Sequence, residues 1–315
     1  MRFIDKKEIY SLADYRELVE IAKKSLMDLS KEKIDVPQRI HINNDDSSAT
    51  YLFMPSLSKK LGRVACKYVG VCNDNAKIGL ASINGIFMLA DSKTGVVESI
   101  LDAASLTAVR TAAISAASVD VLADDNAKIV SIFGSSTQAE SQIRAVCSIR
   151  NIEKVYLFYR TKEKAEKLKN RLSNLGVDIE LSDDRSCLEI SDIIITATNT
   201  IKPLFGSNKQ ERFKDGVHIS AIGSFKPNMQ EVGECVYRDF VIFVDHKESC
   251  IKESGDIILP LSKNLIKEDC INEIGNLLSN NLHSYKHAKT IFKSVGNAAF
   301  DLYVADYILK KSTYL

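Results

Sequence analysis

Apolar residues follow two different spacings in the first part of the chain. Between residues 12 and 32 they recur at every third or fourth position, which is the period of an amphipathic helix. Short apolar runs follow at 50–54, 64–72 and 83–90, each bounded by Gly, Pro, Asn or Asp, and DSKTG at 91–95 is typical of a hairpin turn. Because no helix-length segment separates these runs, we expect an antiparallel sheet packed on one helix.

From residue 121 the pattern changes, because apolar runs now alternate with helical segments. Uniformly apolar strands separated by helices indicate a parallel sheet that is covered on both faces. We therefore expect an α/β fold with a doubly wound parallel sheet between residues 121 and 295. The predicted strands are 128–133, 154–159, 177–181, 192–198, 216–223 and 240–245.

The last helical segment lies within residues 296–315. Its apolar positions do not form a single stripe, so we expect this helix to be buried on more than one side. A helix that clasps both domains would be buried in this way. The chain thus divides into residues 1–120, residues 121–295 and this final helix.

Charge excludes some classes of partner. The 42 Lys and Arg residues nearly balance the 41 Asp and Glu residues, so no overall field attracts nucleic acid or an anionic membrane. We see no apolar run of the roughly 20 residues needed to cross a bilayer, and the N-terminus MRFIDKKEIY lacks the apolar core of a signal peptide. We expect a cytoplasmic protein without a nucleic-acid or membrane partner.

Cysteine and histidine usage indicates neither disulfides nor a metal. The seven cysteines are scattered and include no CxxC pair, which is typical of reduced thiols. His283 and His287 would share one helix face, but no acidic or cysteine partner lies nearby in the sequence. We expect a solvated face there and no metal site.

A motif that fits a dinucleotide follows the strand at 128–133. In a dinucleotide fingerprint the first glycine makes the turn, the second position lets the backbone approach the pyrophosphate, and the third packs helix on strand. Gly134, Ser136 and Ala139 occupy these three positions, and a helical segment and a further strand follow. A plain strand-to-helix turn remains the alternative, because only one position is a strict glycine.

The next strand ends at Tyr159, Arg160, Thr161 and Lys162. An acidic residue here usually binds the ribose 2′-hydroxyl of NAD, and this chain has none. Arg160 and its neighbours can instead meet a 2′-phosphate, which favours NADP(H) over NAD(H). The alternative is that Thr161 caps the next helix and the cations are solvated.

Three cations lie where an anionic substrate could bind. Arg110 lies near the start of an Ala-rich helix, with Ser105 or Thr107 as the expected N-cap, and it suits an anion or a buried ion pair. Arg39 and Lys67 interrupt strand-like stretches. Burying the Lys67 ammonium group is costly unless an opposite charge pairs with it, and an amino-acid carboxylate would provide that charge. A desolvated lysine can also have a lowered pKa and exchange protons. Alternatively, Lys67 points to solvent from an edge strand.

Several stretches, in the same order, resemble the ornithine cyclodeaminase/mu-crystallin family. The resemblance covers nearly the whole chain and is closest to the reductases of ketimines and pyrroline-2-carboxylate. It implies a Rossmann dinucleotide-binding domain at 121–295, and a smaller α+β substrate and dimerisation domain made of 1–120 and the helix at 296–315. The matching stretches are Pro37-x-Arg39, Met54-Pro55, the Lys67 strand, LTAVRTAAISAA, GSSTQA, YRT, TATNTIKP, AIGSFKPNMQE, KESGDIIL and FKSVGNAAFD.

The resemblance also implies roles for individual residues. Lys67 is the catalytic candidate, and Arg39, Lys67, Arg110 and Glu253 match substrate-contacting positions. The cofactor candidates, which include the fingerprint glycine, are Ser82, Arg110, Gly134, Ser136, Thr137, Gln138, Tyr159, Arg160, Thr161, Ala197 and Thr198.

One position departs from part of the family. Cyclodeaminases of this family carry an Asp two residues after the Gly of their AxG motif, where it positions an amine or water. Here that Gly is Gly223 and the later residue is Phe225, which can do neither. We therefore predict a homodimeric, NAD(P)H-dependent reductase of α-imino acids, with cyclic ketimines such as Δ1-pyrroline-2-carboxylate or Δ1-piperideine-2-carboxylate as substrates. The alternatives are an ornithine or lysine cyclodeaminase, an amino-acid dehydrogenase, and a non-catalytic NADP-dependent ligand-binding protein.

Overall fold

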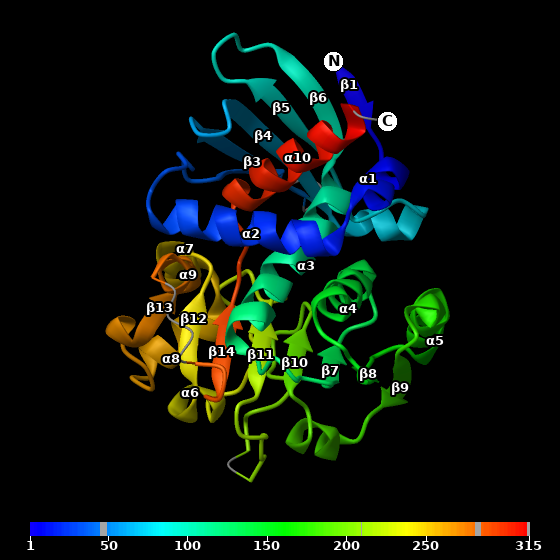
Figure 1. Ribbon diagram of the computed structural model, residues 1–315, viewed down its shortest axis with the longest axis vertical. Coiled ribbons are helices and arrows are strands. Elements are labelled where there is room, and N and C mark those ends of the chain that lie inside the picture. The colour runs from blue at the N-terminus through cyan, green and yellow to red at the C-terminus, as the bar shows by residue number, and fades with distance from the viewer. Residues whose placement is uncertain (45–48, 209, 281–284, 314–315) are drawn as a thin grey trace. The chain divides into compact units, whose positions relative to one another are not determined.

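The computed structural model describes residues 1–44, 49–208, 210–280 and 285–313 (Figure 1). The chain forms two compact units: Met1–Arg110 with Asn297–Leu315 is unit 1, and Thr111–Gly296 is unit 2. The division falls inside helix α3 (Ala103–Leu122), ten residues before the predicted boundary at 120. Because α3 is one continuous apolar helix, no change of pattern marks the point where one unit ends.

Within its described residues, unit 1 contains a six-stranded sheet in the order β1-β6-β5-β4-β3-β2. Neighbouring strands are antiparallel except for β1, which pairs in parallel with β6. The antiparallel sheet was predicted, but β1 and β2 were not, since β1 has three residues and every residue of the edge strand β2 is exposed. The strands are β1 (Arg2–Ile4), β2 (Ile40–Asn44), β3 (Ala49–Ser58), β4 (Arg63–Cys72), β5 (Ile83–Asp91) and β6 (Val97–Asp102).

Two long helices, α2 (Tyr15–Ser30) and α10 (Ala298–Thr313), lie side by side across one face of this sheet (Figure 1). The helix predicted at 12–32 corresponds to α2, which begins three residues later because the Asp14 side chain accepts from the Arg16 amide at 2.9 Å and caps it. The preceding short helix α1 (Lys6–Leu12) was not predicted. The first eight residues of α10 are all buried, as its lack of a single stripe predicted. A short 3-10 helix, η1 (Asn73–Ile78), precedes β5.

The described part of unit 2 contains an eight-stranded parallel sheet in the order β13-β12-β14-β11-β10-β7-β8-β9. The chain runs outward from β7 to β9 and then returns to β10 on the other side of β7, which is the strand reversal of a Rossmann fold. The predicted doubly wound sheet is therefore confirmed. Of its strands, β13, with three residues, and β14, with four, were not predicted. The strands are β7 (Ile129–Phe133), β8 (Lys154–Phe158), β9 (Asp178–Ser182), β10 (Ile193–Thr196), β11 (His218–Ala221), β12 (Val241–Val244), β13 (Ile271–Glu273) and β14 (Thr290–Lys293).

Helices cover both faces of this parallel sheet. On one face, Ala139 and Ile143 of α4 and Leu168 of α5 pack in one buried cluster with Val130 and Ile132 of β7. A second cluster covers the opposite face. The helices are α4 (Thr137–Ile149), α5 (Lys162–Arg171), η2 (Ser173–Leu175), η3 (Arg185–Glu189), α6 (Val236–Asp239), α7 (Lys247–Glu253), α8 (Gly255–Ser262), η4 (Glu268–Cys270) and α9 (Ile274–Ser279).

Helix α3 corrects two expectations. It begins at Ala103, and the Asp102 side chain accepts from the Ser105 amide at 2.8 Å, so neither Ser105 nor Thr107 is the N-cap. By length and composition α3 is also apolar enough to cross a membrane, contrary to the expectation that no such run exists. In this structure 89% of its most apolar stretch is buried, as in the core helix of a folded domain.

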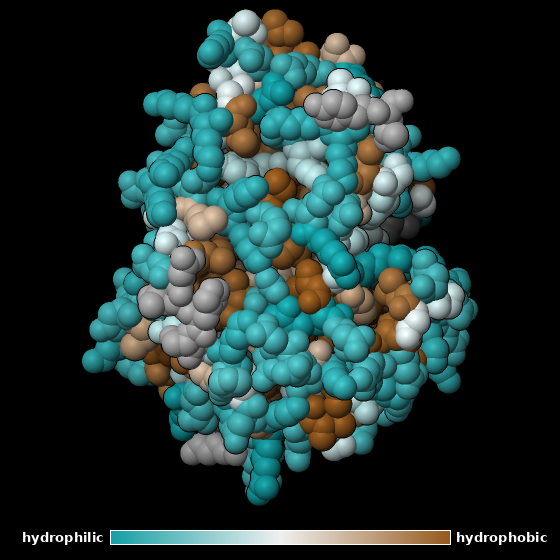
Figure 2. Space-filling model, in the orientation of Figure 1, coloured by the Kyte–Doolittle hydropathy of each residue, from teal (hydrophilic) through white to brown (hydrophobic). Residues whose placement is uncertain are grey.

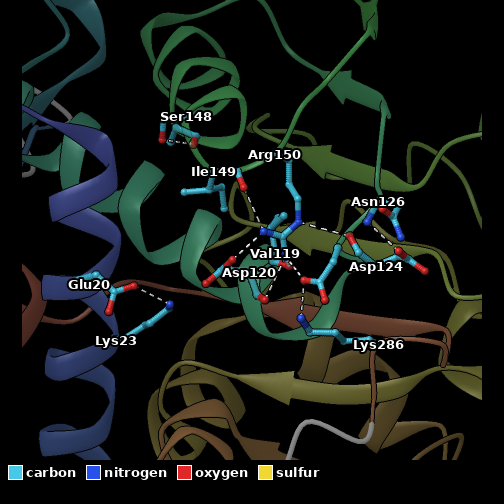
Figure 3. Close-up of polar contacts among 12 residues, drawn as sticks. Glu20, Lys23, Val119, Asp120, Asp124, Asn126, Ser148, Ile149, Arg150 and Lys286 are labelled. Carbon is cyan, nitrogen blue, oxygen red and sulfur yellow. Dashed lines mark hydrogen bonds and ion pairs between the residues drawn. The ribbon is translucent and has the colours of Figure 1, made fainter.

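An arginine whose side chain is nearly covered joins the end of α4 to the end of α3 in unit 2. Arg150, which follows α4, donates from Nη1 to Asp120 of α3 at 2.6 Å and from Nη2 to Asp125 at 3.3 Å (Figure 3). Nearby, His287 lies 3.5 Å from Asp124 and is largely exposed, whereas His283 lies outside the described residues. Polar side chains cover most of the face seen in Figure 2, and the apolar ones form separate patches.

Candidate functional site

Lys67 is buried inside unit 1. It lies on β4, opposite Met54 of β3 and Phe87 of β5, and only 3% of the residue is exposed. The alternative that Lys67 points to solvent from an edge strand is wrong, because β4 has a hydrogen-bonded neighbour on each side. An ammonium group in this position needs a charged partner.

That partner is Asp301 of α10. Its Oδ2 accepts from Lys67 Nζ at 2.8 Å, and its Oδ1 accepts from Arg110 Nε at 3.2 Å. Asp301 is completely buried and Arg110 is nearly so. One carboxylate from the last helix thus joins cations from β4 and α3, including the buried ion pair that was one alternative for Arg110. Asp301 was not predicted, although an acid beside the apolar residues of NAAFD is a usable signal.

Burial and charge together set the ionisation of this group. Burial lowers the pKa of Lys67 from 10.5 to about 8; the Asp301 carboxylate opposes this shift, while the charges of Arg110 and Arg39 add to it. Burial alone would raise the pKa of Asp301, but the charges of Arg110 and Lys67 hold it below its usual value. Asp301 is therefore a carboxylate at neutral pH, while Lys67 can lose a proton under mild conditions.

The remaining predicted substrate residues lie in different places. Arg39 precedes β2, is partly buried, and lies near enough to Lys67 for its charge to act on the Lys67 pKa. Arg110 contacts Asp301 through Nε, and in the described chain Nη1 and Nη2 make no other polar contact, so they form a fork for a carboxylate. Glu253 ends α7 in unit 2, and the predicted cofactor residue Ser82 lies before β5 in unit 1.

In unit 2, the predicted cofactor residues gather at one edge of the parallel sheet. Strands β10, β7 and β8 are adjacent, and the residues in question follow their carboxyl ends. This edge, beside the strand reversal, is where dinucleotides bind in such sheets. The residues are Gly134, Ser136, Thr137 and Gln138 after β7, Tyr159, Arg160 and Thr161 after β8, and Ala197 and Thr198 after β10.

Gly134 makes a turn that other residues would strain. Its φ is +123°, and a Cβ there would lie 2.7 Å from the Ala197 carbonyl oxygen. Its amide donates to the Phe158 carbonyl at 2.9 Å. The glycine therefore lets the turn after β7 pack closely between the ends of β8 and β10.

The N-terminus of α4 has free donors for a phosphate group. Ser136 occupies the N-cap position, but its side chain makes no capping hydrogen bond. Within the described residues, the buried Oε1 of Gln138 also lacks a hydrogen-bond partner, but this oxygen is an acceptor and could bind only a donor group of a cofactor, not a phosphate oxygen. A helix N-terminus with uncapped amides binds a phosphate well, so the start of α4 fits a dinucleotide pyrophosphate.

The cations after β8 are accessible. Arg160, Thr161 and Lys162 are exposed, and Tyr159 is half-buried. Thr161 is the N-cap residue of α5, yet its side chain makes no capping hydrogen bond, which removes the main support for a purely capping role.

The buried carboxyl group of Glu231, which was not predicted, connects the loops that follow β10 and β11 at this edge of the sheet. Glu231 accepts from the Thr198 amide at 2.8 Å, from the Gly223 amide at 2.7 Å and from the Ser224 amide at 3.1 Å. Burial raises its pKa, although the charge of Lys293 opposes this. Glu231 thus joins the ends of β10 and β11. It closes the quoted stretch AIGSFKPNMQE, which also contains Gly223 and Ser224, whereas its third partner, Thr198, lies 33 residues away in sequence.

Comparisons with known proteins agree with this architecture. Residues 3–313 match the model of the ornithine cyclodeaminase/mu-crystallin family. The chain belongs to this family. It is 34% identical to a Δ1-pyrroline-2-carboxylate reductase of Bacillus thuringiensis, covering 99% of this chain and 97% of the relative. It is 30% identical to the ketimine reductase mu-crystallin of the mouse, covering 81% of this chain and 78% of the relative.

A solved structure of this family is similar over its whole length. The Thermococcus litoralis Δ1-pyrroline-2-carboxylate reductase, in complex with NADH and L-proline, superimposes with a TM-score of 0.91 at 30% identity, covering 100% of this chain and 98% of that one. The predicted Rossmann-type fold with a second domain is confirmed. So is the prediction that the chain is a nicotinamide-dependent oxidoreductase.

Phe225, the residue that departs from the family's cyclodeaminases, lies in the loop held by Glu231. The ring is 46% exposed, and Lys226 Nζ lies 5.8 Å from its centre. Gly223, two residues earlier, is tightly enclosed, since a Cβ there would lie 2.0 Å from the Thr198 carbonyl oxygen. The loop therefore presents an apolar ring that can neither orient a water molecule nor exchange a proton.

Proposed function

We propose that this protein reduces cyclic α-imino acids to α-amino acids with NADPH. The observation that carries the proposal is the buried group of Lys67, Arg110 and Asp301, in which an ammonium of lowered pKa lies beside a guanidinium fork. An α-imino acid has a carboxylate and a basic nitrogen on adjacent atoms, which these two cations can meet. The names of the similar reductases support this substrate class.

The residues of unit 1 would bind and polarise the substrate. The Nη1 and Nη2 fork of Arg110, with the charge of Arg39, would neutralise the carboxylate. Lys67 would donate a hydrogen bond or its proton to the imine nitrogen, because an iminium carbon accepts hydride more readily than a neutral imine carbon. The bound nicotinamide supplies the hydride.

The residues of unit 2 would bind the cofactor. The amides at the start of α4 would receive the pyrophosphate, next to the turn at Gly134. Arg160 is exposed where NAD-binding proteins usually have an acid, which supports NADPH over NADH.

The function can be tested by supplying candidate substrates to the purified protein. We expect NADPH to be consumed when Δ1-pyrroline-2-carboxylate or Δ1-piperideine-2-carboxylate is supplied. One NADPH should be consumed for each molecule of proline or pipecolate that is formed. Ornithine with NAD should release no ammonia. Ammonia release without net cofactor change would identify a cyclodeaminase, and binding without turnover would identify a ligand-binding protein.

We also propose that the protein is a homodimer through unit 1. On the sheet face opposite Lys67, the cross-strand register aligns Ile40, Phe53, Tyr68 and Ile86 in one row. Ile40 is 56% exposed and Ile86 is 42% exposed, and Phe53 packs against Tyr68 with ring centres 5.4 Å apart. A second copy of this sheet would cover such an apolar row.

A further inference from the structure

Asp301 occupies a central position among three elements of unit 1. Both of its oxygens are used: Oδ2 accepts from Lys67 on β4 and Oδ1 accepts from Arg110 on α3, at 2.8 and 3.2 Å. Its own helix, α10, is buried over most of its length, so the carboxylate has little freedom to move. A group held in this way fixes the separation of the two cations that it joins.

We propose that Asp301 is a positioning residue, which holds the Lys67 ammonium and the Arg110 fork in the arrangement that one imino acid requires. This inference rests on the proposed function and extends it to a residue that would not itself touch the substrate. The first requirement is that Lys67 and Arg110 can still bind the substrate while they contact Asp301. The second is that Asp301 does more than attach α10 to the sheet.

The geometry meets the first requirement. Because Asp301 binds Arg110 through Nε, the terminal Nη1 and Nη2 keep their fork for a carboxylate. Lys67 donates one of its three N–H groups to Asp301, which leaves two for a substrate nitrogen. Lys67 and Arg110 carry two positive charges against the one negative charge of Asp301, so these three residues keep one positive charge for an incoming carboxylate, and the charge of Arg39 adds to it. Without Asp301, two nearly buried cations would repel each other.

The second requirement can be tested because α10 carries another buried acid, Asp306, which attaches the helix to β4 without contacting Lys67 or Arg110. Asp306 accepts from Arg63 Nε at 3.1 Å, and Arg63 lies on β4, the strand that also carries Lys67. Asp306 is also buried, but its other partner is Lys310 on its own helix. Asp306→Asn therefore removes a contact between the same helix and strand without touching the Lys67 group.

The charged groups that face Lys67 determine the expected pH effect. They are Asp301 from α10, Arg110 from α3, and Arg39 from the segment before β2, while its strand neighbours Met54 and Phe87 do not titrate. Asp301 is the only one of these described groups that favours the ammonium. Asp301→Asn should therefore move the Lys67 titration from about 8 to lower pH, by about 1–3 pH units.

The experiment compares Asp301→Asn, Asp301→Glu and Asp306→Asn with the unmodified protein. Lys67 is titrated by NMR of ¹⁵N-labelled lysine, with Lys67→Met to assign its signal, and L-proline binding is measured by calorimetry in the presence of NADP⁺. We expect Asp301→Asn to lower the Lys67 pKa and to weaken L-proline binding by roughly tenfold or more. Asp306→Asn should change the melting temperature only. The alkaline limb of kcat should shift with the Lys67 pKa.

Asp301→Glu separates charge from position and keeps the test decisive if Asp301→Asn does not fold. Its carboxylate preserves the charge on a longer side chain, so we expect a Lys67 pKa near the unmodified value but weaker L-proline binding and lower kcat. Normal binding and turnover in Asp301→Glu would overturn the positioning role, as would equal effects of Asp301→Asn and Asp306→Asn on every readout. If the unmodified protein reduces no imine while the Lys67 titration still moves, the proposed function fails and the Asp301–Lys67 coupling stands.

Discussion

At Lys67, burial and charge pairing act in opposite directions on one ammonium group. The side chain lies in the middle of an interior strand, so it loses its hydration, and Asp301 compensates only in part. The outcome is a lysine whose pKa of about 8 lies close to the pH at which enzymes work. Proton donation to a substrate nitrogen is the chemistry that such a value favours.

Replacing Lys67 by Met tests this role. We expect kcat and kcat/KM for the cyclic imine to fall together by about two to four decades, because the lost interaction is made in the transition state. Steady-state kinetics at saturating NADPH measures both constants. An unchanged kcat with a raised KM would reduce Lys67 to a carboxylate anchor. The isosteric apolar stem of Met keeps the packing against Met54 and Phe87.

The unmodified enzyme should lose activity on the alkaline side. Lys67 is protonated below a pKa of about 8 and neutral above it, so a reaction that needs the ammonium decreases as pH rises through that value. A kcat profile between neutral pH and pH 10, with cofactor stability controlled at each point, checks this. A rate that rises through the same range would show that neutral Lys67 acts as a base.

Arg160 is the residue on which the cofactor preference depends. Arg160→Ala should weaken the binding of NADPH by roughly ten- to a hundredfold, because a charge-assisted contact to the 2′-phosphate is lost. The binding of NADH should remain nearly unchanged. Fluorescence titration of both reduced cofactors measures the two dissociation constants. Lys169→Ala, at an exposed cation in the last turn of α5, is the matched control. Equal weakening of both cofactors would contradict the assignment.

At the scale of elements, the carboxyl ends of β10 and β11 depend on Glu231 and on the absence of a side chain at Gly223. The three amides that donate to Glu231 belong to the two loops that lie at the predicted cofactor edge. Asp256 accepts from the Glu231 and Val232 amides at 2.8 and 3.0 Å and lies 3.2 Å from Lys293 of β14. A buried polar network therefore joins segments that are distant in sequence.

Gly223→Ala should disrupt this edge. A Cβ would lie 2.0 Å from the Thr198 carbonyl oxygen and 2.4 Å from Glu231 Oε1, so the two loops must separate. We expect a loss of about 1–3 kcal/mol in stability and weaker binding of the reduced cofactor. Gly176→Ala is the control, since Gly176 has a φ of +69° but open space around it. It should cost about 1–2 kcal/mol through backbone strain alone, with cofactor binding unchanged.

At the scale of the whole molecule, the unit 1 sheet uses its two faces differently. One face buries Lys67, Met54 and Phe87 and is covered by helices. On the other face, within the described residues, Ile40 and Ile86 of the apolar row are exposed and Phe53 and Tyr68 are half-buried. Such a row in a chain whose charges balance favours self-association.

Ile86→Lys should therefore convert a dimer into a monomer, because a charge would be buried in an apolar interface without a partner. Light scattering after size-exclusion chromatography measures the mass of each form. Ile190→Lys, at an exposed apolar position in unit 2, is the control and should leave the mass unchanged. A monomeric unmodified protein would disprove the proposed assembly.

Much of the architecture could be read from local pattern. Continuous apolar runs between helices predicted the parallel sheet, and Gly134 after the first of them marked the turn that α4 follows. These features are local, because period, turn chemistry and burial act over a few neighbouring residues. Lys67 could be singled out for the same reason, because a cation within an apolar stretch is unusual, and Arg110 because it lies near the start of a helix. Their substrate roles, and that of Arg39, were implied by the family resemblance.

The partners of these residues could not be predicted in the same way. Asp301 is 234 residues from Lys67 in sequence, and Glu231 is 33 residues from Thr198, so no local pattern relates them. Only the packing of α10 against β4 places the carboxylate beside the ammonium. The pKa of Lys67, the free fork of Arg110 and the shape of the cofactor edge follow from such distant contacts, because electrostatics and burial depend on distance in space and not along the chain.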